Sequence, residues 1–186
     1  MSKAILLSIK PKYLADILNG KKTIEIRKTK PKCDLPIDVY IYCTKDNKNK
    51  LCYVNYEPCG NKGFLTTKLD CEGKELNGKV VAKFTLRKIE VIKKETESGF
   101  LTFTNNPEFY KSACIGVWDM LDYLGNSLGY AWHIEDLVIF DKPKELSEFK
   151  VLLKGNKLDH SIDAINMFNG IPLRKAPQSM CYINVE

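Results

Sequence analysis

The first 27 residues combine compact apolar runs with one short amphipathic stretch. Residues 4–9 (AILLSI) form an apolar run of the length expected for a buried strand. After Pro11, which the first turn of a helix tolerates, apolar residues recur four positions apart until Gly20 supplies a stop. The recurring pairs are Tyr13 with Ile17 and Leu14 with Leu18. The pattern predicts a strand, a short helix, a glycine and a second strand within ILNGKKTIEIR, residues 17–27.

The second strand is expected to present two different faces. Side chains alternate along a strand, so Thr23, Glu25 and Arg27 are predicted to share one face. Ile24 and Ile26 then share the other face, which suits a core. An acid and a base two positions apart on the polar face call for an explanation.

The middle of the chain predicts strands around a polar, turn-rich region. Residues 38–44 (DVYIYCT) are rich in β-branched and aromatic residues. Residues 45–78 hold two short candidate strands, LCYVNY and FLTTKL, among glycines and asparagines, and predict a β-hairpin insertion on the rim of a sheet. The longest strand signal covers 78–92. Val80, Ala82, Phe84 and Leu86 share one phase, and Ile89 and Val91 continue in the opposite phase. Such a change indicates a bulge or a sharp bend.

The second half of the chain mixes helical and strand patterns. Residues 107–125 are predicted to be helical, with interruptions at Gly116 and Gly125, and residues 130–140 (YAWHIEDLVIF) to be extended. Short helical pieces are predicted within 142–149 and at 161–168, and a closing strand in the tail APQSMCYINVE. The fold class is therefore α+β, with mostly antiparallel strands and short flanking helices. A small bent β-barrel is a natural solution, because closure removes exposed strand edges.

The composition fits one globular unit and does not narrow the function far. A length of 186 residues suits a single domain over 1–186, and 44% apolar residues is enough for a core. The net charge of +6 is compatible with a polyanionic partner without requiring one, since AT-rich coding DNA also produces lysine-rich chains. Arginine occurs at Arg27, Arg87 and Arg174 alone, which makes Arg27 more informative than a lysine would be.

The cysteines and the N-terminus bear on location. The start MSKAILLSIKPK does not resemble a signal peptide, and no stretch approaches the ~18 apolar residues of a membrane span. Seven cysteines without an export signal predict a reducing cytoplasm and free thiols. The spacing of Cys52, Cys59 and Cys71 matches no common zinc finger, so neither a metal nor a cofactor is expected.

Glu25 and Arg27 have two interpretations. The simpler one is a solvated strand face with an ion pair worth ~0–1 kcal/mol. The other is a ligand pocket, because a guanidinium grips phosphate or a base edge with two donors while a carboxylate accepts from exocyclic amines or orients the arginine. The helix stop just before the strand, with Lys21 and Lys22 at its entrance, favours a pocket for a nucleotide or nucleobase.

The opening segment LSIKPKYLADILNGKKTIEIRK, with the arrangement GxKTxExR, resembles the ASCH domain, a PUA-like β-barrel family associated with RNA binding. The segments GKVVAKFTL, YAWHIEDLVIF and PLRKAPQSMCYI are similar to the longer phage- and prophage-associated members. The resemblance implies a polar cleft between barrel and helices that binds RNA, a nucleotide or a modified nucleobase. The implied ligand-binding residues are Lys22, Thr23, Glu25, Arg27, Trp132, His133, Gln178 and Ser179, and Gly20 is structural.

Part of this implied site has a simpler reading. Trp132 stacks on a base or packs in the core, and His133 is a ligand contact or a half-buried strand residue. Family members often carry tryptophan soon after the PQS of the tail, where this chain has Met180 and Cys181. An aromatic wall at that place would have to come from Tyr182.

Two other functions stay open at this point. Some small ASCH proteins resemble amidohydrolases that act on acylated cytidine through lysine, threonine and glutamate, for which Lys22, Thr23 and Glu25 are the candidates here. That branch has threonine where this chain has Glu25, and Glu90 is the candidate for its second-strand glutamate. This departure favours a binding module over an enzyme. A regulatory role through a protein partner at residues 45–78 is the third possibility.

Overall fold

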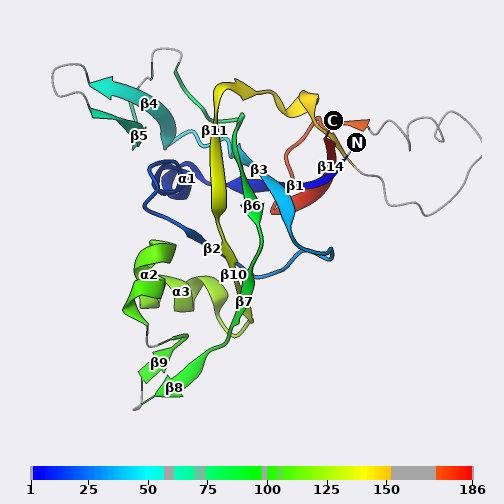
Figure 1. Cartoon of the computed structure of the whole chain (residues 1–186). Coiled ribbons are helices and arrows are strands. Elements are labelled where there is room, and N and C mark those ends of the chain that lie inside the picture. The colour runs from blue at the N-terminus through cyan, green and yellow to red at the C-terminus, as the bar shows by residue number, and fades with distance from the viewer. Residues whose placement is uncertain are drawn as a thin grey trace, which may run out of the picture.

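The computed structural model describes residues 2–56, 61–69, 71, 74–97, 100–104, 106–151 and 171–185. It is an α+β structure in which most strands belong to two sheets (Figure 1). The larger sheet has seven strands in the order β11–β6–β3–β1–β14–β12–β13. These strands are β1 (Ser2–Ile9), β3 (Ile37–Cys43), β6 (Val80–Leu86), β11 (Glu135–Lys144), β12 (Lys150–Val151), β13 (Ile171–Pro172) and β14 (Met180–Val185).

The smaller sheet has three strands in the order β2–β10–β7 and lies below the larger one in Figure 1, next to two helices. The strands are β2 (Ile24–Arg27), β7 (Ile89–Ile92) and β10 (Gly129–His133). Two separate hairpins join β4 (Lys50–Tyr56) with β5 (Asn61–Thr67) and β8 (Glu95–Glu97) with β9 (Phe100–Thr102). The helical elements are α1 (Pro11–Leu18), α2 (Pro107–Ala113), α3 (Val117–Leu124) and the 3₁₀ turn η2 (Leu146–Glu148).

Strand β1 lies in the middle of the larger sheet, parallel to β3 and antiparallel to β14. Its alternate side chains enter two different hydrophobic clusters, with Ile5 and Leu7 in one and Ala4 and Leu6 in the other. Both faces of the strand are therefore covered, which explains why AILLSI is apolar throughout rather than alternating.

The predicted helix after β1 ends where the sequence indicated. Helix α1 stops at Leu18, and Gly20 follows with a φ of +71°, a conformation that glycine adopts without strain. The backbone N–H groups of Lys21 and Lys22 both donate to the Asp16 carbonyl at 2.9 and 3.0 Å. This tight stop delivers the chain directly into β2.

The change of phase near residue 87 is a passage from one sheet to the other. β6 ends at Leu86 in the larger sheet, and β7 begins at Ile89 in the smaller one, so the predicted bend is present. Strands β10 and β11 make the same passage with one residue between them. One detail of the prediction is wrong: Val91 is 52% exposed, and Ile92 is the residue that enters the core. A closed barrel stays a prediction.

The two strands predicted within residues 45–78 form the hairpin β4–β5, which packs on α1. The Asn19 side chain fastens it, because its amide donates to the Phe64 carbonyl at 2.6 Å and accepts from the Phe64 N–H at 2.9 Å. A disulfide joins Cys52 to Cys71, with the two Cα atoms 6.1 Å apart. The expectation of free thiols is therefore wrong for this pair, because the turn that returns toward β4 brings two distant cysteines together.

The helical prediction over 107–125 resolves into α2 and α3. Cys114 has a φ of 47° and ends α2, so the break comes two residues before Gly116, which is the N-cap of α3. A second hydrophobic cluster forms where α2 and α3 cover the smaller sheet, and it includes Ile24, Ile26, Phe109, Met120, Leu124 and Ala131. The helix predicted at 161–168 lies outside the described residues. Across the described part of the chain, we find no helix with the length and apolar character that a membrane crossing requires.

Candidate functional site

Three charged side chains meet on the inner face of β2 and at its entrance. One Glu25 carboxylate oxygen lies 3.4 Å from Lys22 Nζ, and the other lies 3.4 Å from an Arg27 guanidinium nitrogen. The side chains are 4% exposed for Lys22, 9% for Glu25 and 13% for Arg27. The interpretation as a solvated strand face is therefore wrong. One carboxylate holds two cations in a region nearly shielded from bulk water.

Lys22 is held in this cluster by the end of α2. Its ammonium donates to the Ala113 carbonyl at 2.5 Å, where the helix leaves its last carbonyls free. A cation at a helix C-terminus also opposes the negative end of the helix dipole. The Thr23 N–H donates to the Ser112 carbonyl at 2.8 Å, so the same turn of α2 fixes the neighbouring backbone. Part of the role of Lys22 is thus to fasten α2 to β2.

Arg27 links β2 to the C-terminal tail. Its guanidinium donates to Ser179 Oγ at 2.5 Å and to the Ser8 carbonyl at 3.4 Å. The tail is in turn fixed to β1, because the Ser8 hydroxyl donates to the Pro177 carbonyl at 2.7 Å and the Ser8 N–H donates to the Ser179 carbonyl at 2.9 Å. The tail segment predicted from PLRKAPQSMCYI therefore closes one side of the site.

The charged cluster borders a cleft of about 740 Å³ between the larger sheet and α3. Of the eight residues predicted to bind a ligand, five line this cleft: Lys22, Glu25, Arg27, Gln178 and Ser179. Five basic side chains and two acidic ones border it, which leaves an excess of three positive charges. The basic residues are Lys10, Lys22, Arg27, Lys28 and Lys45, and the acidic ones are Glu25 and Asp119. This balance suits an anionic ligand.

Two tyrosines line the same cleft from different helices. Tyr13 of α1 is 37% exposed and Tyr123 of α3 is 39% exposed, so both present ring surface to a ligand. A lysine lies over each ring, with Lys22 Nζ 5.9 Å from the Tyr13 centroid and Lys28 Nζ 5.3 Å from the Tyr123 centroid. Partial burial raises the pKa of Tyr123, so its hydroxyl stays neutral and able to donate at physiological pH.

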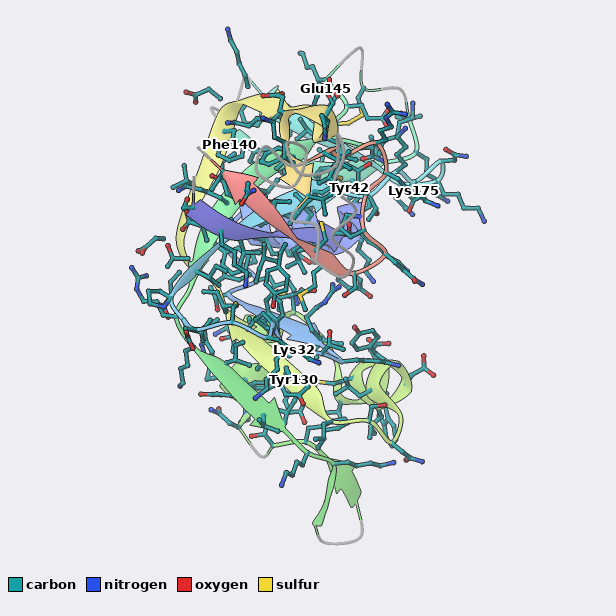
Figure 2. The ribbon with its side chains drawn as sticks, turned by 90° about the vertical axis from the view of Figure 1, so that its right-hand side faces the viewer. Lys32, Tyr42, Tyr130, Phe140, Glu145 and Lys175 are labelled. Atoms are coloured by element: carbon teal, nitrogen blue, oxygen red, sulfur yellow. A yellow bond between two sulfur atoms is a disulfide. The ribbon has the colours of Figure 1, made fainter. Side chains whose placement is uncertain are left out.

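Trp132 supports the site from behind and does not line the cleft. In the register of β2 and β10, Trp132 lies opposite Glu25, and Tyr130 lies opposite Arg27, so all four point to the same side of the smaller sheet. In Figure 2 the strand that carries Tyr130 lies below the larger sheet. Trp132 is 0% exposed and belongs to the main core. Of its two predicted roles, the structure places it in the core.

Thr23 and His133 lie outside the cleft as well. Thr23 precedes β2 and is exposed, so it does not share the face of Glu25 and Arg27 as predicted. His133 Nε2 lies 3.5 Å from a Glu90 carboxylate oxygen, away from the cleft lining. A hydrogen bond from Lys88 lowers the pKa of Glu90, which keeps this carboxyl ionised. The lysine, threonine and glutamate of the hydrolase reading are therefore not brought together around the cleft.

Several residues of the cleft were not predicted as site residues. Lys10, Tyr13, Lys45 and Tyr123 come from four segments that only the fold brings together. Tyr13 was paired with Ile17 in the helical pattern, and the structure separates them, because Ile17 is fully buried while Tyr13 faces the cleft. For Tyr123 a sequence signal existed, since Asp119 and Tyr123 are four positions apart on a helix and both are exposed.

Comparison with known proteins agrees with this architecture. The chain resembles the crystal structure of an ASCH protein from Zymomonas mobilis, with a TM-score of 0.51 and 16% identity over 97% of this chain and 87% of that one. Two single-substitution variants of that protein give TM-scores of 0.51 and 0.52 at 15% and 16% identity; they match 97% and 98% of this chain, and 88% and 91% of their own. At these identities the likeness bears on the fold. No match was found among curated proteins.

A family comparison covers most of the chain. The model of the ASCH domain, generally an RNA-binding module of PUA-like fold, matches residues 7–143. This range contains the GxKTxExR strand and the helices that border the cleft, while Gln178 and Ser179 lie beyond it. With three quarters of its length matched, the chain belongs to the ASCH domain family.

Proposed function

We propose that this protein binds RNA or a nucleotide, with a base or phosphate held at Glu25 and Arg27. The observation that carries the proposal is the convergence of that carboxylate and guanidinium in a sheltered cleft of net positive charge. Arg27 offers donors for phosphate or a base edge, and Glu25 accepts from the exocyclic amine of a base. Tyr13 and Tyr123 provide aromatic surface on the same walls, which suits a nucleobase better than a bare anion.

Several finer points belong to the same proposal. We take the chain as one domain over 1–186, with residues 45–78 as an insertion, and the strands that pass from sheet to sheet support a PUA-like barrel. The likeness to the longer phage- and prophage-associated members is supported by the tail, which contributes Gln178 and Ser179 to the cleft. The cytoplasm is the proposed location, because RNA and nucleotides are present there.

Arg27→Ala is expected to weaken binding of a labelled single-stranded RNA or a ribonucleotide by about 5- to 150-fold, the loss of one bidentate charged contact worth ~1–3 kcal/mol. Fluorescence anisotropy and calorimetry measure the affinities, and wild-type RNA binding should fall as salt is raised. Arg27→Lys should lie between, because lysine keeps the charge but loses the planar fork.

Arg87→Ala is the matched control for this experiment. Arg87 pairs with Glu135 and Asp136 on the surface, is 47% exposed and does not line the cleft. Its removal should leave the affinity unchanged. Equal affinities for wild type and Arg27→Ala, with thermal melts that show both proteins folded, would reject the cleft as the binding site.

The hairpin β4–β5 supports a second candidate function, a regulatory contact with a protein. Tyr53 and Leu65 are each 40% exposed, and Leu69 just after the hairpin is 76% exposed. Exposed apolar residues gathered on one element are typical of an interaction surface. Leu65→Glu together with Leu69→Glu should release a protein partner in co-purification without changing RNA affinity. A partner that stays bound to this variant would contradict a role for the hairpin.

A further inference from the structure

Trp118 is the most exposed of the large apolar side chains that the structure describes, at 77%. The chain has two tryptophans, and the other, Trp132, is completely buried. Tryptophan carries a large apolar surface, so leaving it in water is unfavourable unless a partner covers it in the working state. The position of Trp118 therefore asks for an occupant.

Trp118 lies directly beside the cleft. It occupies the first turn of α3, one position before Asp119, and Asp119 and Tyr123 form part of the cleft wall. Successive residues of a helix are separated by roughly 100° around its axis, so Trp118 projects to the side of that wall and not into the cavity. A ligand that leaves the cleft past α3 would meet the indole.

The surroundings of Trp118 favour a base over an apolar protein surface. The exposed residues of α3 next to it include the carboxylates Asp119 and Asp122, so the tryptophan stands among polar groups and not in an apolar patch. Carboxylates repel phosphate but accept hydrogen bonds from exocyclic amines. This arrangement suits the flat face and amino edge of a nucleobase, while the phosphates stay near the excess positive charge of the cleft.

The size of the cleft points the same way. A volume of about 740 Å³ lies within the range of pockets that hold one small ligand, so a longer strand must continue over the rim. We infer that the ligand is a single-stranded oligonucleotide, of which one nucleotide occupies the cleft and a neighbouring base stacks on Trp118. This inference rests on the proposed function and adds to it the polymeric nature of the ligand and its path over α3.

The test compares a random-sequence single-stranded RNA hexamer with the four ribonucleoside 5′-monophosphates. Wild type should bind the hexamer more tightly than any monophosphate. Trp118→Ala should weaken hexamer binding by about 5- to 150-fold, which corresponds to ~1–3 kcal/mol for one stacked base at 1.4 kcal/mol per tenfold. Monophosphate affinity should not change, because Trp118 does not line the cleft. Trp118→Tyr should retain most of the affinity and Trp118→Leu should not, because stacking requires a ring.

Fluorescence gives an independent readout in the unmodified protein. Trp118 is accessible to acrylamide and Trp132 is not, so the hexamer should protect the accessible fraction from quenching while a monophosphate should not. Tyr53→Ala serves as a control that removes an exposed aromatic residue from the β4–β5 hairpin, outside the cleft. It should leave both affinities unchanged.

The failure of the inference and the failure of the proposed function differ in this design. If monophosphates bind in an Arg27-dependent way but Trp118→Ala binds the hexamer like wild type, the inference is overturned and the proposed function stands. If wild type binds neither probe, both fall. If wild type is a dimer that Trp118→Ala separates in light scattering, the indole is covered by a second copy, and the inference is again overturned.

Discussion

Replacing Glu25 by alanine is expected to lower the free energy of unfolding by about 3–5 kcal/mol. The substitution leaves the ammonium of Lys22 and the guanidinium of Arg27 without their shared carboxylate, and the two side chains are only 4% and 13% exposed. Two uncompensated cations so nearly removed from water raise the energy of the folded state, whereas in the unfolded chain both are hydrated. Urea unfolding measures the change as a shift of the midpoint at constant slope.

Two controls separate charge burial from the loss of any carboxylate. Glu25→Gln keeps the shape and one acceptor oxygen but not the charge, so its loss should be smaller than that of Glu25→Ala. Glu135→Ala removes the carboxylate of a half-exposed pair with Arg87 and should cost less than about 1 kcal/mol. A Glu25→Ala protein that unfolds at the same midpoint as Glu135→Ala would show that the cluster is well solvated, and the sheltered site would have to be abandoned.

Trp132→Ala is the second substitution expected to have a large effect, about 3–5 kcal/mol of lost stability. The indole is fully buried in the main core, opposite Glu25 in the sheet register, and its removal opens a cavity beneath the charged cluster. Trp118→Ala is the matched comparison within the same chain. Because Trp118 is 77% exposed, its loss should change stability by no more than about 0.5 kcal/mol.

The milder variant Trp132→Phe distinguishes packing from stacking on a ligand. Phenylalanine fills much of the indole volume, so we expect a folded protein with reduced stability and ribonucleotide affinity close to wild type. If Trp132→Phe instead lost affinity while its urea midpoint stayed unchanged, the indole would contact the ligand and the core assignment would be incorrect.

The candidate site shows which kinds of inference a single sequence supports. The alternation of Glu25 and Arg27 with Ile24 and Ile26 predicted the two faces of β2, and the structure has them, with the isoleucines in the core. Thr23 followed the same alternation and was misplaced, because β2 begins one residue later and Thr23 lies in the connection pinned by Ser112. A strand period predicts faces only within the strand, and the start of a strand depends on the contacts that form around it.

The sequence by itself determined the order of strands and helices, the stop at Gly20, the bend after Leu86 and the pairing of an acid and a base on one face. These features depend on backbone preferences and on the period of apolar residues, which are local. The tertiary structure alone decided that Arg27 meets Ser179 across 152 positions, that Tyr13 and Tyr123 line one cleft, and that Cys52 joins Cys71. It also placed Trp132 inside and left Trp118 in water. Such outcomes depend on sheet register and on which distant segments pack together, and no local pattern encodes either.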